Sequence, residues 1–169
     1  MAACLETAQQ RYSSQDAAID ALSRTLIANT LKSQRCTSGV EDLYRALKAT
    51  LAHRESEDFP PTLEEKELVS TMTNVDWIDA TDYHLAVENA CRTRVFFSTA
   101  SKIGLGPSGM QLGDMVYIIR NTRTPFVLRP VGGKPDHFRL IGETYVHGVM
   151  CGEAFRSSGE HEFKNVYLD

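Results

Sequence analysis

The sequence lacks the cysteine spacing of the common small metal and redox motifs. Its four cysteines, at positions 4, 36, 91 and 151, lie far apart and form no CxxC pair, which excludes zinc fingers, zinc ribbons and thioredoxin-like sites. A secretory signal peptide has a basic start followed by an apolar stretch, and the first residues, MAACLETAQQRY, have neither. We therefore expect reduced thiols in a cytoplasmic protein, with no metal and no cofactor.

Long apolar runs are also missing. No run approaches the ~20 residues that a membrane-spanning helix needs, and the C-terminus carries no lipidation signal, so we expect no membrane partner. The chain is net acidic, at −4, with one Trp and no stripe of arginines and aromatics, which argues against nucleic-acid binding. The 169 residues are 42% hydrophobic and 24% charged, a globular composition that suffices for one domain or two small lobes.

The charge is divided unevenly along the chain. Residues 1–90 hold 8 Lys and Arg against 15 Asp and Glu, whereas residues 91–169 hold 10 against 7. A basic second half could face an acidic partner. Alternatively, the two halves attract each other inside one fold, and we favour this second interpretation.

The first half carries helical periodicity. Ser13 and Asp16 resemble a capping box, and apolar residues then recur at spacings of three to five, as on one face of an amphipathic helix. This face comprises Ile19, Leu22, Leu26 or Ile27, and Leu31. Similar stripes predict three more helices: one after Ser38, one after Thr62 that buries Leu63, and one from about Thr81 to Cys91.

Near residue 93 the sequence changes to short β-branched and aromatic stretches bounded by turn residues. The predicted strands are RVFFST, GDMVYIIR, PFVLRPV, HFRLIGETYVHG and FKNVYLD. The glycines of segment 103–109 are assigned to a tight crossing, because this segment lacks the spacing and the Lys-Ser/Thr ending of a phosphate loop.

Together these patterns predict an α+β fold. An N-terminal helical lobe, residues 1–92, is expected to pack on a small C-terminal antiparallel β-barrel, residues 93–169, as one compact unit. An SH3-like barrel is the preferred shape, and an open sheet covered by the helices is the alternative.

An ordered set of blocks in the second half carries a family resemblance. The blocks are Phe96–Thr99, Ile103–Pro107, Gly113–Asp114, Pro125–Pro130, Leu140–Glu143 and Tyr145–Met150, followed by Gly152 and Glu153. In order and spacing they resemble the C-terminal region of fungal heterokaryon-incompatibility (HET) domain proteins. The segment Ser23–Ala28 resembles a shorter element that precedes this region, while Cys151 stands where an acid is common.

The HET domain itself has no counterpart in the sequence, so its chemistry is not carried over. The resemblance implies a setting instead: a fungal cytosolic protein connected with self/non-self recognition and programmed cell death.

The densest group of chemically capable side chains lies between residues 143 and 153. Glu143, Tyr145 and His147 would project on the same side of one strand, and such a row could transfer protons in a pocket. A solvated strand face explains the same three residues without catalysis. Cys151 could act with His147 as a nucleophilic pair or share a metal site with it, but no third residue completes either pattern.

Arg129 stands in the apolar stretch PFVLRPV. A buried arginine needs a carboxylate, so we expect Arg129 to be at least half buried and paired with Glu143 or Glu153. Arg129, Glu153 and Cys151 are also the candidate binding residues.

Two functions remain open. The first is a non-enzymatic interaction or regulatory module of a HET-type protein, with a protein partner and an oligomeric state that the sequence does not determine. The alternative is a small stand-alone enzyme with a proton-transfer pocket around His147 and Glu143.

Overall fold

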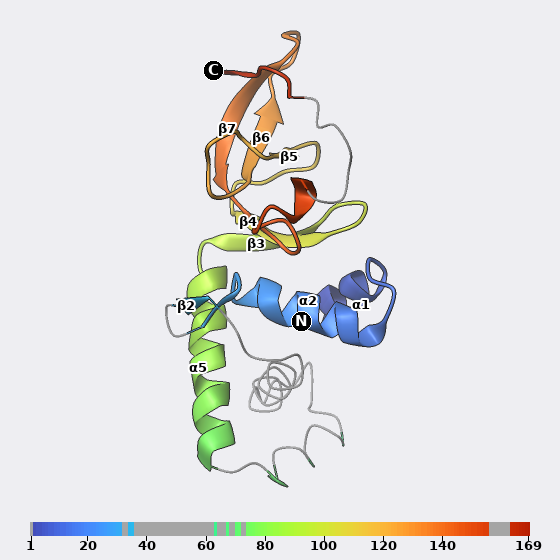
Figure 1. Ribbon diagram of the computed structural model, residues 1–169, viewed down its shortest axis with the longest axis vertical. Coiled ribbons are helices and arrows are strands. Elements are labelled where there is room, and N and C mark those ends of the chain that lie inside the picture. The colour runs from blue at the N-terminus through green and yellow to red at the C-terminus, as the bar shows by residue number, and fades with distance from the viewer. Residues whose placement is uncertain are drawn as a thin grey trace. The chain divides into compact units, whose positions relative to one another are not determined.

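The chain forms two compact units, Met1–Arg92 and Thr93–Asp169, referred to below as the helical unit and the strand unit (Figure 1). The computed structural model describes residues 2–31, 34–35, 63, 67, 70–71, 74–155 and 163–169. The predicted α+β class is confirmed, since helices dominate the first unit and strands the second. The boundary coincides with the change in sequence pattern, whereas the packing of one unit on the other stays a prediction.

The helical unit contains α1 (Ala2–Gln9), α2 (Gln15–Leu26), the short strands β1 (Thr30–Leu31) and β2 (Gln34–Arg35), and α5 (Asn74–Cys91). The helix α1 was not among the predicted elements. The predicted helix after Ser38 lies outside the described residues, as does most of the one after Thr62, but Leu63 is 76% exposed, so its expected burial is wrong. Among the described helices, none combines the length and the apolar character needed to cross a membrane.

Helix α2 begins and ends for local reasons. Its N-cap is Ser14, whose hydroxyl accepts the Ala17 N–H at 3.2 Å, one residue after the predicted Ser13. The helix stops because Ala28 and Asn29 adopt left-handed φ values of 47° and 55°, and the Asn29 N–H then reaches back to the Arg24 carbonyl at 2.7 Å. The predicted burial of Ile19, Leu22 and Leu26 is confirmed, but Leu31 belongs to β1.

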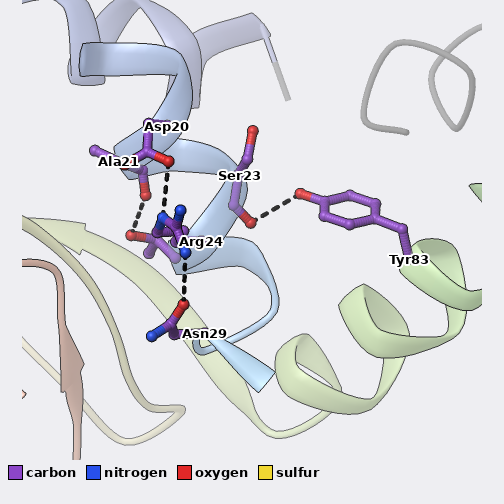
Figure 2. Close-up of polar contacts among 7 residues, drawn as sticks. Asp20, Ala21, Ser23, Arg24, Asn29 and Tyr83 are labelled. Atoms are coloured by element: carbon purple, nitrogen blue, oxygen red, sulfur yellow. Dashed lines mark hydrogen bonds and ion pairs between the residues drawn. The ribbon is translucent and has the colours of Figure 1, made fainter. Parts of the chain in front are cut away.

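A buried hydrogen bond joins helices α2 and α5. Tyr83 of α5 is fully buried, and its hydroxyl donates to the Ser23 carbonyl at 2.9 Å (Figure 2). Figure 2 also shows Arg24, which donates to Asp20 at 2.7 Å and to Asn29 at 3.3 Å and so supports the end of α2. The segment Ser23–Ala28, which carried a family resemblance, therefore forms the end of α2 and its contact with α5. The helix α5 begins at Asn74, seven residues before the predicted start.

The strand unit contains two sheets. Strands β3 (Arg94–Ser98), β4 (Ile103–Pro107) and β8 (Tyr145–Val146) form one sheet in the order β3-β4-β8. Strands β5 (Met115–Tyr117), β6 (Phe126–Pro130), β7 (His137–Glu143) and β9 (Tyr167–Leu168) form the other in the order β5-β6-β7-β9. A short 3₁₀ helix, η1, spans Glu153–Phe155.

The predicted antiparallel arrangement holds for every pair in this unit except one. Strand β9 runs parallel to β7, so the prediction is wrong there. Within the described residues the strands form two sheets rather than one closed ring, and the SH3-like shape stays a prediction.

Strand β4 corrects the prediction of a glycine-rich crossing. It is the central strand of its sheet, and residues 103–106 are all buried. The core around it consists of Ile103, Leu105, Val127, Leu128, Phe138, Tyr145 and Val146, each at most 5% exposed. The consecutive burial of Val127 and Leu128 coincides with a register shift between β6 and β7 at these two residues.

One residue separates β7 of the four-stranded sheet from β8 of the three-stranded sheet. Thr144 lies between Glu143, the last residue of β7, and Tyr145, the first of β8. It is 1% exposed. Its N–H donates to the Pro125 carbonyl at 3.0 Å and its hydroxyl to the Leu105 carbonyl at 2.9 Å. The chain therefore changes sheet at a corner where the side chain and the backbone are both bonded.

We expect Thr144→Val to lower the free energy of unfolding by about 0.5–1.5 kcal/mol, because valine keeps the shape but loses the hydroxyl bond to Leu105. Thr144→Ser keeps the donor and serves as the matched variant. Denaturant unfolding of the full chain measures both. A valine variant as stable as the wild type would show that the hydroxyl contributes nothing to the corner.

Candidate functional site

The predicted proton-transfer row is not assembled on one strand. Glu143 is exposed at the end of β7, Tyr145 is 4% exposed in β8, and His147 is half buried beyond β8. The His147 N–H continues the pairing with β4 by donating to the Ile103 carbonyl at 3.0 Å. The premise that the three residues lie on one strand is therefore wrong, because β7 ends at Glu143 and the chain enters the other sheet after Thr144. Their catalytic role stays a prediction.

Cys151 and Glu153 form a local turn. The Cys151 N–H donates to a Glu153 carboxylate oxygen at 2.5 Å, at the residue where η1 begins. Cys151 is half buried and takes part in no disulfide, and the same holds for Cys4. In the described part of the chain, no three His, Cys, Asp or Glu residues gather as metal ligands. The binding role predicted for Cys151 and Glu153 stays a prediction.

Arg129 has a different partner from the one predicted. Its side chain is 27% exposed, so the expected burial is confirmed, but it pairs with Asp114 rather than Glu143 or Glu153. The contact is bidentate: Nε lies 2.7 Å from one carboxylate oxygen and Nη2 lies 2.9 Å from the other. The sequence prediction fails because Asp114 lies in a turn before β5, and only the register of β5 on β6 brings it beneath Arg129.

The carboxylate of Asp114 is enclosed by donors. Its side chain is 1% exposed, and one oxygen also accepts the Gln111 N–H at 2.8 Å. The hydrogen bond from Arg129 holds the pKa of Asp114 below its usual value; burial opposes this shift, and the Gln111 N–H adds to it. Asp114 is therefore a carboxylate whose charge is already satisfied within the protein.

The same ion pair fixes a loop. Arg129 Nη2 donates to the Gly109 carbonyl at 2.8 Å as well as to Asp114. Segment 108–113, here called the groove loop, is thereby bonded to β6 at Gly109 and closed at its end by Asp114. Short backbone bonds, from Met110 to Pro107 at 3.0 Å and from Asp114 to Gln111 at 3.2 Å, tighten it further.

Two glycines of β4 make room for apolar side chains. A Cβ atom at Gly104 would overlap the Tyr145 carbonyl oxygen and lie 2.6 Å from the Phe97 ring. A Cβ atom at Gly106 would overlap the Met110 sulfur. The Phe97 ring and the Met110 thioether therefore occupy the space that side chains at positions 104 and 106 would fill.

These parts border a partly open groove of about 620 Å³, here called the β3–β5 groove. Its lining comes from β3 and the following residue, from the groove loop with Asp114, and from the start of β5. The lining residues are Val95, Phe96, Phe97, Ser98, Thr99, Met110, Gln111, Leu112, Gly113, Asp114, Met115 and Val116. The volume falls in the range of ligand-binding clefts, ~300–1,000 Å³.

The exposed apolar residues mark the groove as a contact surface. Leu112 at the tip of the groove loop is fully exposed, Met115 is 47% exposed and Val95 is 38% exposed. Among the described lining residues, Asp114 is the only one with an ionisable side chain, and its charge is neutralised by Arg129. Sequence reasoning missed this site; the signal available was the apolar Met110 and Leu112 within a glycine-rich turn.

A family model described as the Het-6 beta-barrel domain matches residues 7–168. The chain is also similar to heterokaryon incompatibility protein 6, OR allele, of Neurospora crassa, with 29% identity over 101 residues. That alignment covers 59% of this chain and 15% of the Neurospora protein, so the chain corresponds to a small part of a much longer relative. No solved structure gives a significant match. The resemblance to HET proteins that the six sequence blocks predicted is confirmed.

We expect Gly104→Ala to lower the free energy of unfolding by about 1–3 kcal/mol, because the new methyl group meets a backbone carbonyl and an aromatic ring in a packed strand. Gly132→Ala is the matched control, since no heavy atom lies within 4 Å of its Cβ position. Its effect should stay within about 0.5 kcal/mol. Equal effects in thermal or denaturant unfolding would contradict the packing role of Gly104.

The Asp114–Arg129 pair should make stability depend on pH. Because folding lowers the pKa of Asp114, the contribution of this carboxylate is fully present above its unfolded-state pKa, near 4, and is lost as the pH falls through the folded-state value. We expect Asp114→Asn to lower the free energy of unfolding at pH 7 by about 1–3 kcal/mol. This difference from the wild type should shrink as the pH is lowered towards 2.

Asp136→Asn is the control for this measurement, because Asp136 is 52% exposed and pairs with Lys164 at the surface. It should leave stability nearly unchanged across the same pH range. A difference between wild type and Asp114→Asn that does not vary with pH would show that the charge of Asp114 is not what stabilises the groove loop.

Proposed function

The chain belongs to the Het-6 beta-barrel domain family, and on that premise we propose that it is a non-enzymatic interaction module of a HET-type fungal protein. In this proposal the strand unit recognises another protein through the β3–β5 groove. The setting is a cytoplasmic response concerned with self/non-self recognition and cell death.

The observation that carries the proposal is the groove itself. It combines apolar side chains that face solvent, Leu112 above all, with a rim held in place by the ion pair between Arg129 and Asp114. A fixed apolar cleft with little charge is typical of a surface that another molecule covers. Because Asp114 is already bonded, its carboxylate is better suited to holding the rim than to acting as a proton carrier.

The curated relative supports the setting. The name of the Neurospora crassa protein links it to heterokaryon incompatibility. Since the aligned region is 15% of that protein, the rest of such a protein has ample room for a separate effector. We infer that the strand unit supplies recognition rather than the effector step.

Site-specific crosslinking tests the proposal. A photoreactive phenylalanine analogue at position 112 would sit at the mouth of the groove, while the same analogue at Leu140, which is 46% exposed and outside the groove lining, is the matched control. In fungal extract we expect a discrete crosslinked protein from position 112 and none from position 140. Identical patterns from both positions would overturn the assignment of the groove as the recognition surface.

A further inference from the structure

Strand β3 presents a free edge beside the groove. Among the strands that the structure describes, β3 is bonded to β4 alone, since the order in this sheet is β3-β4-β8. The Ser108 N–H donates to the Thr93 carbonyl at 3.2 Å, and the Thr99 N–H donates to the Lys102 carbonyl at 2.8 Å. Odd-numbered residues of this strand therefore use their backbone groups on β4.

The alternation of an antiparallel ladder then determines which backbone groups lie on the outer edge of β3. In such a ladder, every second residue directs its N–H and C=O away from the partner strand. Those residues are Arg94, Phe96 and Ser98. Among the described residues, no backbone partner covers their outward groups, so they form a template for another strand.

This free edge and the groove coincide. Residues 95–98 of β3 line the groove on one side, and Met115 and Val116 of β5 line it as well. Strand β5 is also an edge strand, since β6 is its sole partner within the described part of the strand unit. The groove is thus bordered by residues of two edge strands from the two sheets, a place where an extended chain can find backbone partners and apolar contacts together.

The low charge of the lining indicates which side chains a bound segment would carry. Of the described residues that line the groove, Asp114 alone is ionisable, and its carboxylate accepts hydrogen bonds from Arg129 and from the Gln111 N–H. A charged side chain of a partner would lose its hydration on entering the groove and would find no counterion available in the lining. This loss of hydration is costly in free energy. Apolar and hydroxyl side chains fit better, and the thioethers of Met110 and Met115 can adapt to varied shapes.

We propose that the β3–β5 groove binds an extended, uncharged peptide segment of a partner protein, which pairs with the outer edge of β3 as an additional strand. The segment is about five residues long, matching Arg94–Ser98, and places alternate apolar side chains against Phe97, Met110 and Met115. This inference rests on the proposed function, because it names the class of partner that the same groove recognises.

Substitution of Ser98 tests the backbone pairing directly. The N–H of Ser98 points to the free edge, so Ser98→Pro removes an outward donor without breaking a bond to β4, and edge strands tolerate proline at such positions. Ser98→Ala keeps the N–H and is the matched control. The probe is a phage-displayed library of random seven-residue peptides, selected on the full chain.

We expect the selected peptides to be poor in charge and rich in β-branched and aromatic residues. Ser98→Pro should bind them at least tenfold more weakly than Ser98→Ala, because only the alanine variant keeps the outward amide donor. Hydrogen exchange should show new protection of the Phe96 and Ser98 amides on binding. A selected peptide that is N-methylated at alternate amides should also lose at least tenfold, which gives a second measurement if Ser98→Pro does not fold.

The other outcomes separate this inference from the proposed function. Peptides that bind Ser98→Pro as well as wild type, or that are charged or helical, overturn strand addition but not recognition. The same holds if no peptide is selected while position 112 still crosslinks to a discrete protein. Self-association that Ser98→Pro abolishes would make the occupant a second copy of the chain. Failure of both selection and crosslinking would remove the proposed function as well.

Discussion

The strand unit depends on one change of sheet within a continuous chain segment. Residues 137–146 serve first as β7 in the four-stranded sheet and then as β8 in the three-stranded sheet, with Thr144 between them. The corner is held because the backbone and the side chain of Thr144 both reach carbonyl groups, at Pro125 and at Leu105. Since the two sheets share this segment, the corner acts together with the groove loop, which joins β4 to β5, in placing β3 relative to β5.

A second constraint acts on the rim of the groove. Exposed ion pairs contribute little to stability, but the Asp114 side chain is 1% exposed while Arg129 is 27% exposed, so their contact is partly shielded from water. By also bonding Gly109, Arg129 ties the groove loop to β6. The apolar tip at Leu112 can therefore stay in water without collapsing onto the sheet, because the backbone beneath it is fixed by polar contacts.

Local patterns in the sequence predict most strands and the family, but not the site. Strand β4 was not predicted because Gly104 and Gly106 interrupt the pattern of apolar residues. These glycines are needed because the side chains of Phe97 and Met110 occupy the space beside them. The partner of Arg129 depends on strand register across fifteen residues, which spacing alone does not encode. The prediction that Glu143, Tyr145 and His147 form a row on one strand fails because side chains alternate regularly only within a strand, and the chain leaves β7 at Thr144.

The distance in sequence between β4 and β8 has a consequence for synthesis. The hairpin of β3 and β4 is local, but the other side of β4 pairs with Tyr145 and Val146, and the Thr144 hydroxyl bonds a residue 39 positions upstream. At translation rates of ~5–20 residues per second, this edge of β4 waits roughly 2–8 s for its partner strand after it leaves the ribosome. During that interval an apolar strand edge is open on the nascent chain and can pair with another strand until β8 emerges.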